Sequence, residues 1–444
     1  MCSSVSCSTF TKMPDPDKDR FLAGAGLFSL YLRIALHVAG RYLLRPDRFG
    51  YSPAAFLRFL VRALRLLLVF RDNKPVRVPG GWKIDLYLPA YPSRAFFSAL
   101  ESKLLVSPPL PLTVVFSTTK ACSYKCAHCY QRKDSGEDLP EELLLKTARE
   151  MQDLGVAMFD IEGGEPLLRL PRLLDLLRAL DDRSELWLNT TGAGLNPEII
   201  AQLKAARLFG VMISIHSPDT ATHDALTGIP GSFETACAAA RACRKAGLVT
   251  AVNSVLSEQE ITGGRLAQLM DLTRELDADF VQLIHPKPAG MWLGRRENMQ
   301  RDPAVIAYIR RLHRQYNTST DGHPCLVSQV LEEAPGRLGC TSGAVDRFYL
   351  NACGEVQPCE FLNLSFGNVR EEPFKAILER MRSYFRVPCS DWLCCTQSAE
   401  IDRLFHEHNL ARTPLPWAVT KTLVEKWDRG APTPLYKKLG IYKK

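Results

Sequence analysis

The chain has 444 residues, of which 46% are hydrophobic and 23% charged, a composition that is typical of a globular protein and excludes a fibrous or disordered one. This length exceeds what one ordinary core holds, so we expect two or three units, one of them large enough for an enzyme. The formal net charge is +8, and residues 1–75 hold twelve Lys or Arg against five acids, a surplus of seven. A basic surplus of this kind indicates an anionic partner, either a membrane surface or nucleic acid.

Residues 1–75 are predicted to form a basic helical region, with helices at 21–45 and 54–71. In the second helix Arg58, Arg62 and Arg65 fall on one face among apolar side chains. Two interpretations stay open: a helix half-buried against the main domain with an exposed arginine stripe, or a helix lying on anionic lipid. The region shows no aromatic–basic stacking platform of the kind that single-strand binders use, which argues against nucleic acid.

Neither a secretory signal nor a transmembrane helix is predicted. The first twenty residues are polar, and the apolar run at 22–32 is shorter than the roughly 20 residues that a span needs. We therefore expect a cytoplasmic protein, with attachment to the inner face of the membrane as the alternative. Fourteen cysteines in a reducing compartment indicate metal ligands rather than disulfides.

Residues 76–111 are predicted to hold a β segment at 82–88 and a proline-rich linker. Residues 112–320 then alternate between strands and helices, which indicates βαβ units on a parallel sheet. Strands are expected at 112–117, 157–161, 186–189, 210–215, 249–255 and 280–284, and helices at 141–154, 171–180, 197–206, 233–246 and 264–276. The pattern predicts an α/β fold, either a partial (β/α)6 TIM-like barrel or a doubly wound sheet, with its chemistry at the C-terminal ends of the strands.

Three cysteines follow the first strand of this region closely: Cys122, Cys126 and Cys129. Three thiolates in one loop can bind three irons of a [4Fe–4S] cluster and leave the fourth iron open, as a catalytic site requires. A zinc site is the alternative, although it needs four closed ligands and only His128 lies nearby.

The spacing C-x3-C-x2-C after a first strand resembles that of radical S-adenosylmethionine (SAM) enzymes. The second strand ends in a stretch that resembles the family's SAM-binding G-G-E-P: Gly163, Gly164, Glu165 and Pro166. Glycine permits close backbone approach, and a carboxylate suits an ammonium group. The resemblance covers about residues 112–290 and implies that the cluster cleaves SAM reductively.

The same resemblance implies further SAM contacts. His128 occupies a position where the family usually has an aromatic residue near the adenine. Asn189 lies in a polar stretch after the third strand, Ser214 and His216 lie at the end of the fourth, and Asn253 lies on the fifth.

Residues 321–400 carry a second group of cysteines and resemble the SPASM extension, whose opening pattern is C-x9–15-G-x4-C. The resemblance implies an auxiliary [4Fe–4S] cluster, held by Cys340, Cys359, Cys389 and either Cys394 or Cys395, with Cys325 and Cys353 as further candidates. The series is shorter than in a full SPASM domain, which favours one auxiliary cluster. A structural zinc site is the alternative. Residues 401–444 are predicted to form a helical tail.

The family resemblance implies a radical SAM enzyme that abstracts hydrogen from a peptide or protein and receives electrons from a donor such as flavodoxin or ferredoxin. The basic apolar N-terminus favours a second hypothesis, a membrane-surface enzyme acting on a lipid or another apolar molecule. A non-catalytic iron–sulfur or zinc protein is a third hypothesis. The sequence identifies no general base.

Overall fold

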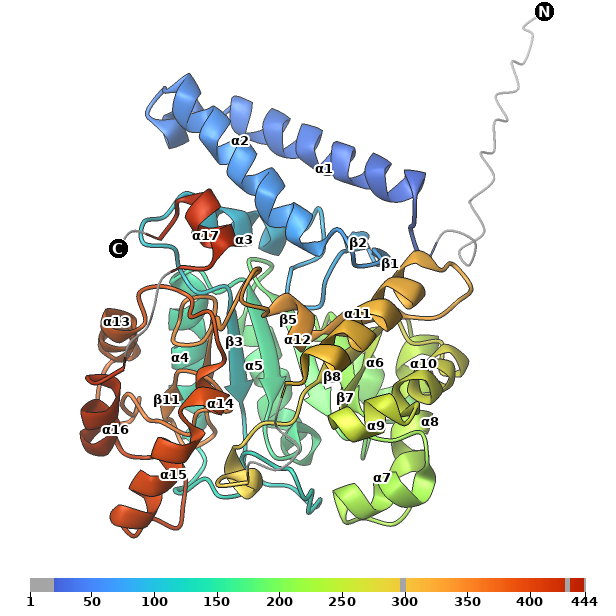
Figure 1. Cartoon of the computed structure of the whole chain (residues 1–444), viewed down its shortest axis with the longest axis vertical. Helices are drawn as coiled ribbons and strands as arrows, with labels where there is room; N and C mark the ends of the chain where they lie inside the picture. The colour runs from blue at the N-terminus through green and yellow to red at the C-terminus, as the bar shows by residue number, and fades with distance from the viewer. Residues whose placement is uncertain (1–19, 296–300, 428–431, 443–444) are drawn as a thin grey trace, which may run out of the picture.

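A nine-stranded sheet forms the centre of the molecule in the computed structural model, which describes residues 20–295, 301–427 and 432–442. The strand order is β11-β10-β3-β4-β5-β6-β7-β8-β9, and every neighbouring pair from β10 to β9 is parallel. Neighbours along this order pair only once, so the described edge strands β11 and β9 do not close the sheet into a full barrel (Figure 1). The predicted α/β partial barrel is confirmed.

The six predicted strands form the middle of this sheet. Their bounds are β3 (Thr113–Ser117), β4 (Met158–Glu162), β5 (Glu185–Thr190), β6 (Gly210–Ser214), β7 (Val249–Val255) and β8 (Phe280–Ile284). Most of their residues are buried on both faces, as expected for a parallel sheet covered by helices. Beyond them lie β9 (Cys325–Ser328), β10 (Arg347–Leu350) and β11 (Val356–Gln357).

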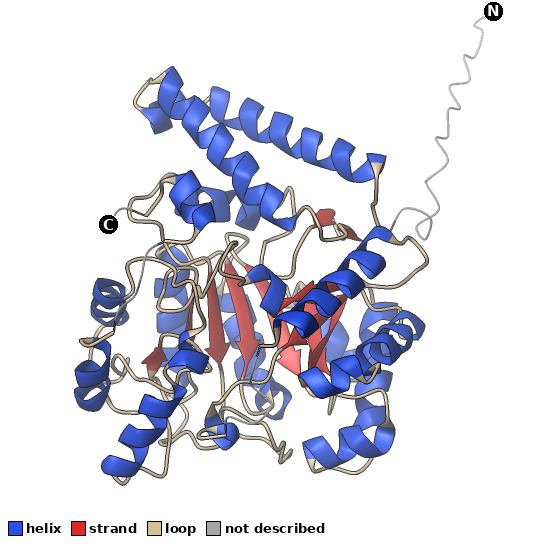
Figure 2. Cartoon of the chain, viewed as in Figure 1, coloured by secondary structure: helices blue, strands red, loops and turns tan. Residues whose placement is uncertain are grey.

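Helices connect the strands and cover the outside of the sheet (Figure 2). The crossover helices are α4 (Glu141–Asp153), α5 (Leu170–Ala179), α6 (Pro197–Ala205), α7 (Thr220–Thr227), α8 (Ser232–Lys245), α9 (Glu258–Thr262), α10 (Arg265–Glu275) and α11 (Pro303–Thr318). Short 3-10 turns, η3 (Pro166–Arg169) and η4 (Gly290–Trp292), follow β4 and β8. The apolar faces of these helices and the strands share one core.

The N-terminal region forms a helical hairpin of α1 (Ala25–Leu43) and α2 (Pro53–Leu67), joined through η1 (Pro46–Phe49) and ending in η2 (Leu68–Phe70). The strand predicted at 82–88 is wrong, because β1 (Val76–Val78) and β2 (Gly81–Lys83) form a short hairpin that ends earlier. The predicted linker is also wrong in part, since residues 94–104 form α3 (Arg94–Leu104) under a Ser93 cap. Lys12 and Lys18, part of the predicted basic surplus, lie outside the described residues.

The arginine stripe of α2 faces the C-terminal end of the chain. Arg62 donates to the carbonyl of Gly440 (2.9 Å) and Arg65 to that of Lys438 (2.8 Å), at α17 (Pro434–Leu439). Cationic side chains suit these carbonyls because a helix C-terminus carries partial negative charge. Arg65 is exposed and Arg62 half-buried, and both arginines of the stripe have partners at the C-terminal end of the chain.

The cysteine-rich segment extends the sheet, because its strand β10 pairs in parallel with β3. The helices α12 (Gln329–Glu332), α13 (Phe374–Tyr384), α14 (Leu393–Thr396), α15 (Ser398–Glu407) and α16 (Trp417–Val424) complete it. Its apolar side chains join the same core as those of the barrel. None of the described helices has the length and apolar character that crossing a bilayer requires.

Candidate active site

The loop after β3 carries Cys122, Cys126 and Cys129 at the C-terminal edge of the sheet. Two backbone N–H groups, of Lys125 and Ala127, donate to carbonyls at the end of α7 at 2.9 Å each. The carbonyl of Cys129 accepts from a backbone N–H of η4 at 3.0 Å. Backbone hydrogen bonds to the segments that follow β6 and β8 therefore hold the loop in place, independently of any ligand.

Gly163 and Gly164 allow the end of β4 to pack directly against this loop. A Cβ atom at Gly163 would lie 2.5 Å from the carbonyl oxygen of Thr119, and one at Gly164 only 2.3 Å from that of Ala121. The Gly164 N–H donates to the Thr119 carbonyl at 2.6 Å. The two glycines are thus required by the approach of the cysteine loop itself, a reason that the sequence alone did not provide.

The Glu165 side chain is directed at the end of β5. Its carboxylate accepts hydrogen bonds from the hydroxyl groups of Thr190 (2.8 Å) and Thr191 (2.6 Å) and from the Thr191 N–H (2.9 Å). Burial raises its pKa. Glu165 and Pro166 do not belong to the lining of the cavity described next. The expected pairing of Glu165 with an ammonium group stays a prediction.

A cavity of about 410 Å³ opens beside the cysteine loop and collects side chains from the ends of β3 to β8. The three cysteines line it together with seven of the nine predicted SAM contacts. Those seven are Gly163, Gly164, His128, Asn189, Ser214, His216 and Asn253. The structure thus brings these residues together around one cavity, as expected for strand ends in a parallel sheet.

Two predicted contacts leave hydrogen-bonding capacity unused. The Oδ1 atoms of Asn189 and Asn253 are buried, and neither has a hydrogen-bond partner among the described residues. A buried acceptor without a partner is costly, so a bound group with N–H or O–H donors would satisfy both. An amino acid or ribose moiety of SAM supplies such donors, and the cavity therefore fits this cofactor.

Three histidines lie in line along the cavity. The His128 and His216 rings meet edge to face with centroids 4.4 Å apart, and His223 stacks on His216 at 6.0 Å. Burial lowers the pKa of His128 to about 4 and that of His216 well below its usual value. Both rings are therefore neutral at pH 7. The Val255 N–H donates to His216 Nδ1 at 3.3 Å, which leaves the other ring nitrogen to carry the proton.

The thiols fit a cluster better than a single metal ion. Within the described ranges, no three His, Cys, Asp or Glu side chains converge closely enough to hold one ion. A cubane cluster does not need such convergence, because each thiolate binds a different iron. Burial raises the pKa of Cys126 to about 12, so deprotonation of this thiol depends on a bound cation such as cluster iron.

Several residues of the cavity were missed from the sequence. The Glu162 carboxylate accepts hydrogen bonds from the Tyr130 hydroxyl and from Gln131, and burial raises its pKa well above the usual value. Trp292 packs against His128 with ring centroids 5.6 Å apart. The positions of Tyr130 beside Cys129 and of Glu162 beside the glycines were available signals, whereas nothing in the sequence indicated Trp292.

The second cysteine group surrounds a small pocket of about 10 Å³ that Cys340, Cys359 and Cys394 line together. Cys389 joins this group through backbone hydrogen bonds with Cys340 (2.8 and 3.2 Å). A hydrogen bond with the Cys394 thiol lowers the pKa of Cys395 to about 6. The cysteines of this group come from the segments before β10 and after β11, from the segment after α13, and from α14.

The two remaining candidates lie elsewhere. Cys325 is on β9 in the buried cluster with Phe280, at the opposite edge of the sheet from β10. Cys353 packs against the turn at Gly136, where a Cβ atom would lie 3.2 Å from it. Neither lines the pocket of the second group.

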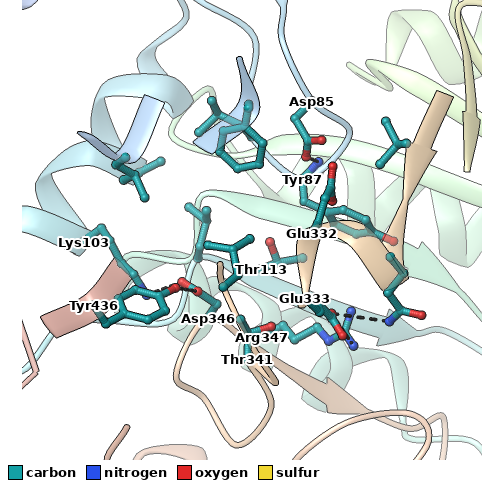
Figure 3. Close-up of a pocket in the computed structure, with 18 of the residues that line it drawn as sticks. Asp85, Tyr87, Lys103, Thr113, Glu332, Glu333, Thr341, Asp346, Arg347 and Tyr436 are labelled. Atoms are coloured by element: carbon teal, nitrogen blue, oxygen red, sulfur yellow. Dashed lines mark hydrogen bonds and ion pairs between the residues drawn. The ribbon is translucent and has the colours of Figure 1, made fainter. Parts of the chain in front are cut away.

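Charged side chains connect this second group to its surroundings. Lys287 lines both the large cavity and the small pocket, with its ammonium group 2.8 Å from the Trp392 ring centroid. Arg347 pairs with Glu333 at 3.1 Å and lies 3.8 Å from the Cys359 sulfur. Arg347 and Glu333 also line a third cavity (Figure 3). This cavity has about 90 Å³ and is lined as well by Leu66 of α2 and Leu100 of α3. Two cationic side chains, Lys287 and Arg347, therefore line the pocket of the second cysteine group.

Comparison with known proteins agrees with this geometry. Residues 116–260 match the radical SAM superfamily model, and residues 340–399 match SPASM, an iron–sulfur cluster-binding domain. The AdoMet-dependent heme synthase of Methanosarcina barkeri is 28% identical over 295 residues, 61% of this chain and 82% of that protein.

Solved structures of Streptococcus suis SuiB have a similar fold. The SAM-bound structure gives a TM-score of 0.51 at 18% identity over 63% of this chain and 69% of SuiB. The structure bound to the precursor peptide SuiA gives 0.51 at 18% identity over 70% and 76%.

The matches show a radical SAM domain over residues 116–260 and a SPASM domain over residues 340–399, the organisation of a radical SAM enzyme with a C-terminal SPASM domain. The chain is an enzyme that combines these two domains. Its cofactors are SAM, a SAM-binding [4Fe–4S] cluster and auxiliary iron–sulfur clusters in the SPASM domain.

Proposed function

We propose that this enzyme abstracts a hydrogen atom from a peptide or protein segment bound in the 410 Å³ cavity. The observation that carries the proposal is the shared cavity itself: three thiols, the glycine pair and two buried unpartnered Asn oxygens face one space. When bound, the cluster and SAM supply reductive cleavage of the sulfonium bond and a carbon-centred radical.

The residues of the chain hold and orient these groups. Cys122, Cys126 and Cys129 would hold the SAM-binding cluster, while Asn189 and Asn253 would accept hydrogen bonds from SAM. His128 and His216 add no positive charge to the cavity that would hold the cationic SAM, because burial keeps both rings neutral.

The second cysteine group would hold the auxiliary cluster next to the same cavity, through Cys340, Cys359, Cys389 and Cys394, with Cys395 as the alternative fourth ligand. Lys287 lines both spaces, so a substrate in the cavity lies near the auxiliary site. This position suits transfer of an electron from the substrate to the auxiliary cluster after hydrogen abstraction.

Exposed basic residues surround the mouth of the cavity, namely Lys120, Lys125, Arg132 and Arg412. Complementary charge accelerates the encounter of protein partners. We therefore propose an acidic one-electron donor such as flavodoxin or ferredoxin as the physiological reductant.

The peptide substrate is supported by the fold shared with SuiB, whose structure holds the peptide SuiA. A small apolar molecule is the second candidate, because the heme synthase relative is more similar in sequence than SuiB is.

Deuterium transfer distinguishes the two candidates. The reduced enzyme would be given SAM with either deuterated peptides translated from genes adjacent to its own or a deuterated tetrapyrrole. Deuterium in 5′-deoxyadenosine from a peptide alone supports the proposal. Deuterium from the tetrapyrrole alone assigns the second candidate.

A further inference from the structure

The helical hairpin of α1 and α2 exposes most of the large apolar side chains found on the described surface. Ten of the twelve large hydrophobic residues that are exposed in the described ranges lie between residues 28 and 68. They are Phe28, Leu32, Leu36, Leu43, Leu44, Tyr51, Leu57, Val61, Leu64 and Leu68. Monomeric proteins rarely gather exposed apolar side chains in this way without a partner.

These side chains form a second apolar stripe on each helix. One such stripe consists of Leu57, Val61 and Leu64 of α2 and Leu68 at the start of η2, which repeat at intervals of four, three and four residues and share one face. The buried residues of α2, which include Phe59, lie on another face and pack with α3 and α17. The exposed stripe therefore does not take part in the packing of the hairpin on the rest of the described protein.

The charge beside the stripes is almost entirely positive. Residues 25–68, which span the hairpin, contain seven arginines and a single acid, Asp47, which gives a surplus of six charges (seven minus one). Arg33, Arg45, Arg48 and Arg58 are exposed on the hairpin. A helix face that combines leucines with neighbouring arginines has the composition that binds the interface of an anionic bilayer.

We propose that the α1–α2 hairpin docks this enzyme on an anionic lipid bilayer, with the leucine stripes inserted among the acyl chains and the exposed arginines on the headgroups. Charge complementarity favours lipid over a second copy of the chain, because two copies would bring two arginine-rich hairpins together. The proposal does not depend on the identity of the substrate.

The docked orientation follows from the fold. The end of α2 and η2 packs over the N-terminal ends of the strands, since Leu66 and Phe70 share a cavity with the first residues of β3 and β10, Thr113 and Arg347. The SAM cavity collects residues that follow the C-terminal ends. The hairpin lies at the opposite end of the molecule from the cysteine loop (Figure 1). Docking therefore leaves the SAM cavity facing water, which suits a water-borne substrate.

Flotation of the full-length reconstituted enzyme tests the proposal. The probe is a vesicle of 70% phosphatidylcholine and 30% phosphatidylglycerol, compared with pure phosphatidylcholine. The variant Leu57→Gln/Leu64→Gln changes only exposed side chains, and Leu168→Gln, an exposed leucine of η3 that is 52% accessible, is the matched control. Circular dichroism and iron content check that all three proteins are folded.

We expect flotation with anionic vesicles, at least about tenfold weaker binding of the double variant, and wild-type binding of the control. Added salt should weaken binding, because headgroup attraction is screened. Absence of flotation, or equal binding of the double variant, overturns the proposal. Concentration-dependent dimerisation that the double variant loses, without flotation, assigns the stripes to self-association instead and also overturns it.

Discussion

Substitution of Gly164 by alanine should remove the SAM-binding cluster while leaving the fold intact. The new Cβ would lie 2.3 Å from the Ala121 carbonyl oxygen and 2.6 Å from its carbon, and both are backbone atoms that cannot rotate away. Overpacking of this kind costs about 1–3 kcal/mol, against a total stability of about 5–15 kcal/mol for a typical domain. The chain should therefore stay folded and relieve the clash by displacing the cysteine loop.

Iron content after anaerobic reconstitution measures this effect. With one auxiliary cluster, we expect a fall from about eight to about four irons per chain, because each [4Fe–4S] cluster contributes four. Gly336→Ala is the control, since its Cβ would meet nothing within 4 Å and its φ is not left-handed. A Gly164→Ala protein with full iron content would show that the close packing does not determine the position of the loop.

Three further predictions concern buried charges. In the wild type, Lys83 Nζ lies 2.5 Å from Glu185 Oε1, and Lys83→Met leaves this buried carboxylate without its cation. The free energy of unfolding, measured in denaturant, should therefore fall by about 3–5 kcal/mol. The double variant Lys83→Met/Glu185→Gln should recover part of this loss, because it removes the unpaired charge. Burial raises the pKa of Asp160 from 3.8 to about 7, so between these pH values the folded state binds a proton that the unfolded state has lost. The free energy of unfolding should therefore fall as pH rises from about 4 to about 7. In Asp160→Asn, the free energy of unfolding should depend less steeply on pH over this range. Arg347→Gln removes a positive charge near the Cys359 sulfur, which disfavours the reduced and more negative state of the auxiliary cluster. The midpoint potential of this cluster, followed by electron paramagnetic resonance, should therefore become more negative. An unchanged potential would contradict an influence of the Arg347 charge on the cluster.

Local sequence patterns were sufficient to predict the centre of the fold. β7 and β8 have the bounds that their apolar runs indicated, because strands buried on both faces leave a continuous hydrophobic signal. The cysteine loop and the glycine pair were placed on neighbouring strand ends for the same reason.

Long-range packing escaped prediction. The parallel pairing of β10 with β3 joins segments more than 200 residues apart, and nothing local indicates it. The periodicity of α2 identified its apolar and basic faces but not their partners, so the contact of Arg62 with the C-terminal end and the exposure of Leu57 required the structure. The hydrogen bonds that the Glu165 carboxylate accepts from Thr190 and Thr191 join the ends of β4 and β5, and nothing in the sequence indicated them.

Formation of 5′-deoxyadenosine tests the central claim most directly. The protein would be reconstituted anaerobically, reduced with dithionite and given SAM, alongside Cys126→Ala, in which one thiol of the β3 loop is missing. We predict 5′-deoxyadenosine from the wild type and none above background from the variant. Equal product from both proteins, or a wild type that binds zinc in place of iron and makes no product, would contradict the assignment of this loop as the SAM-cleaving site.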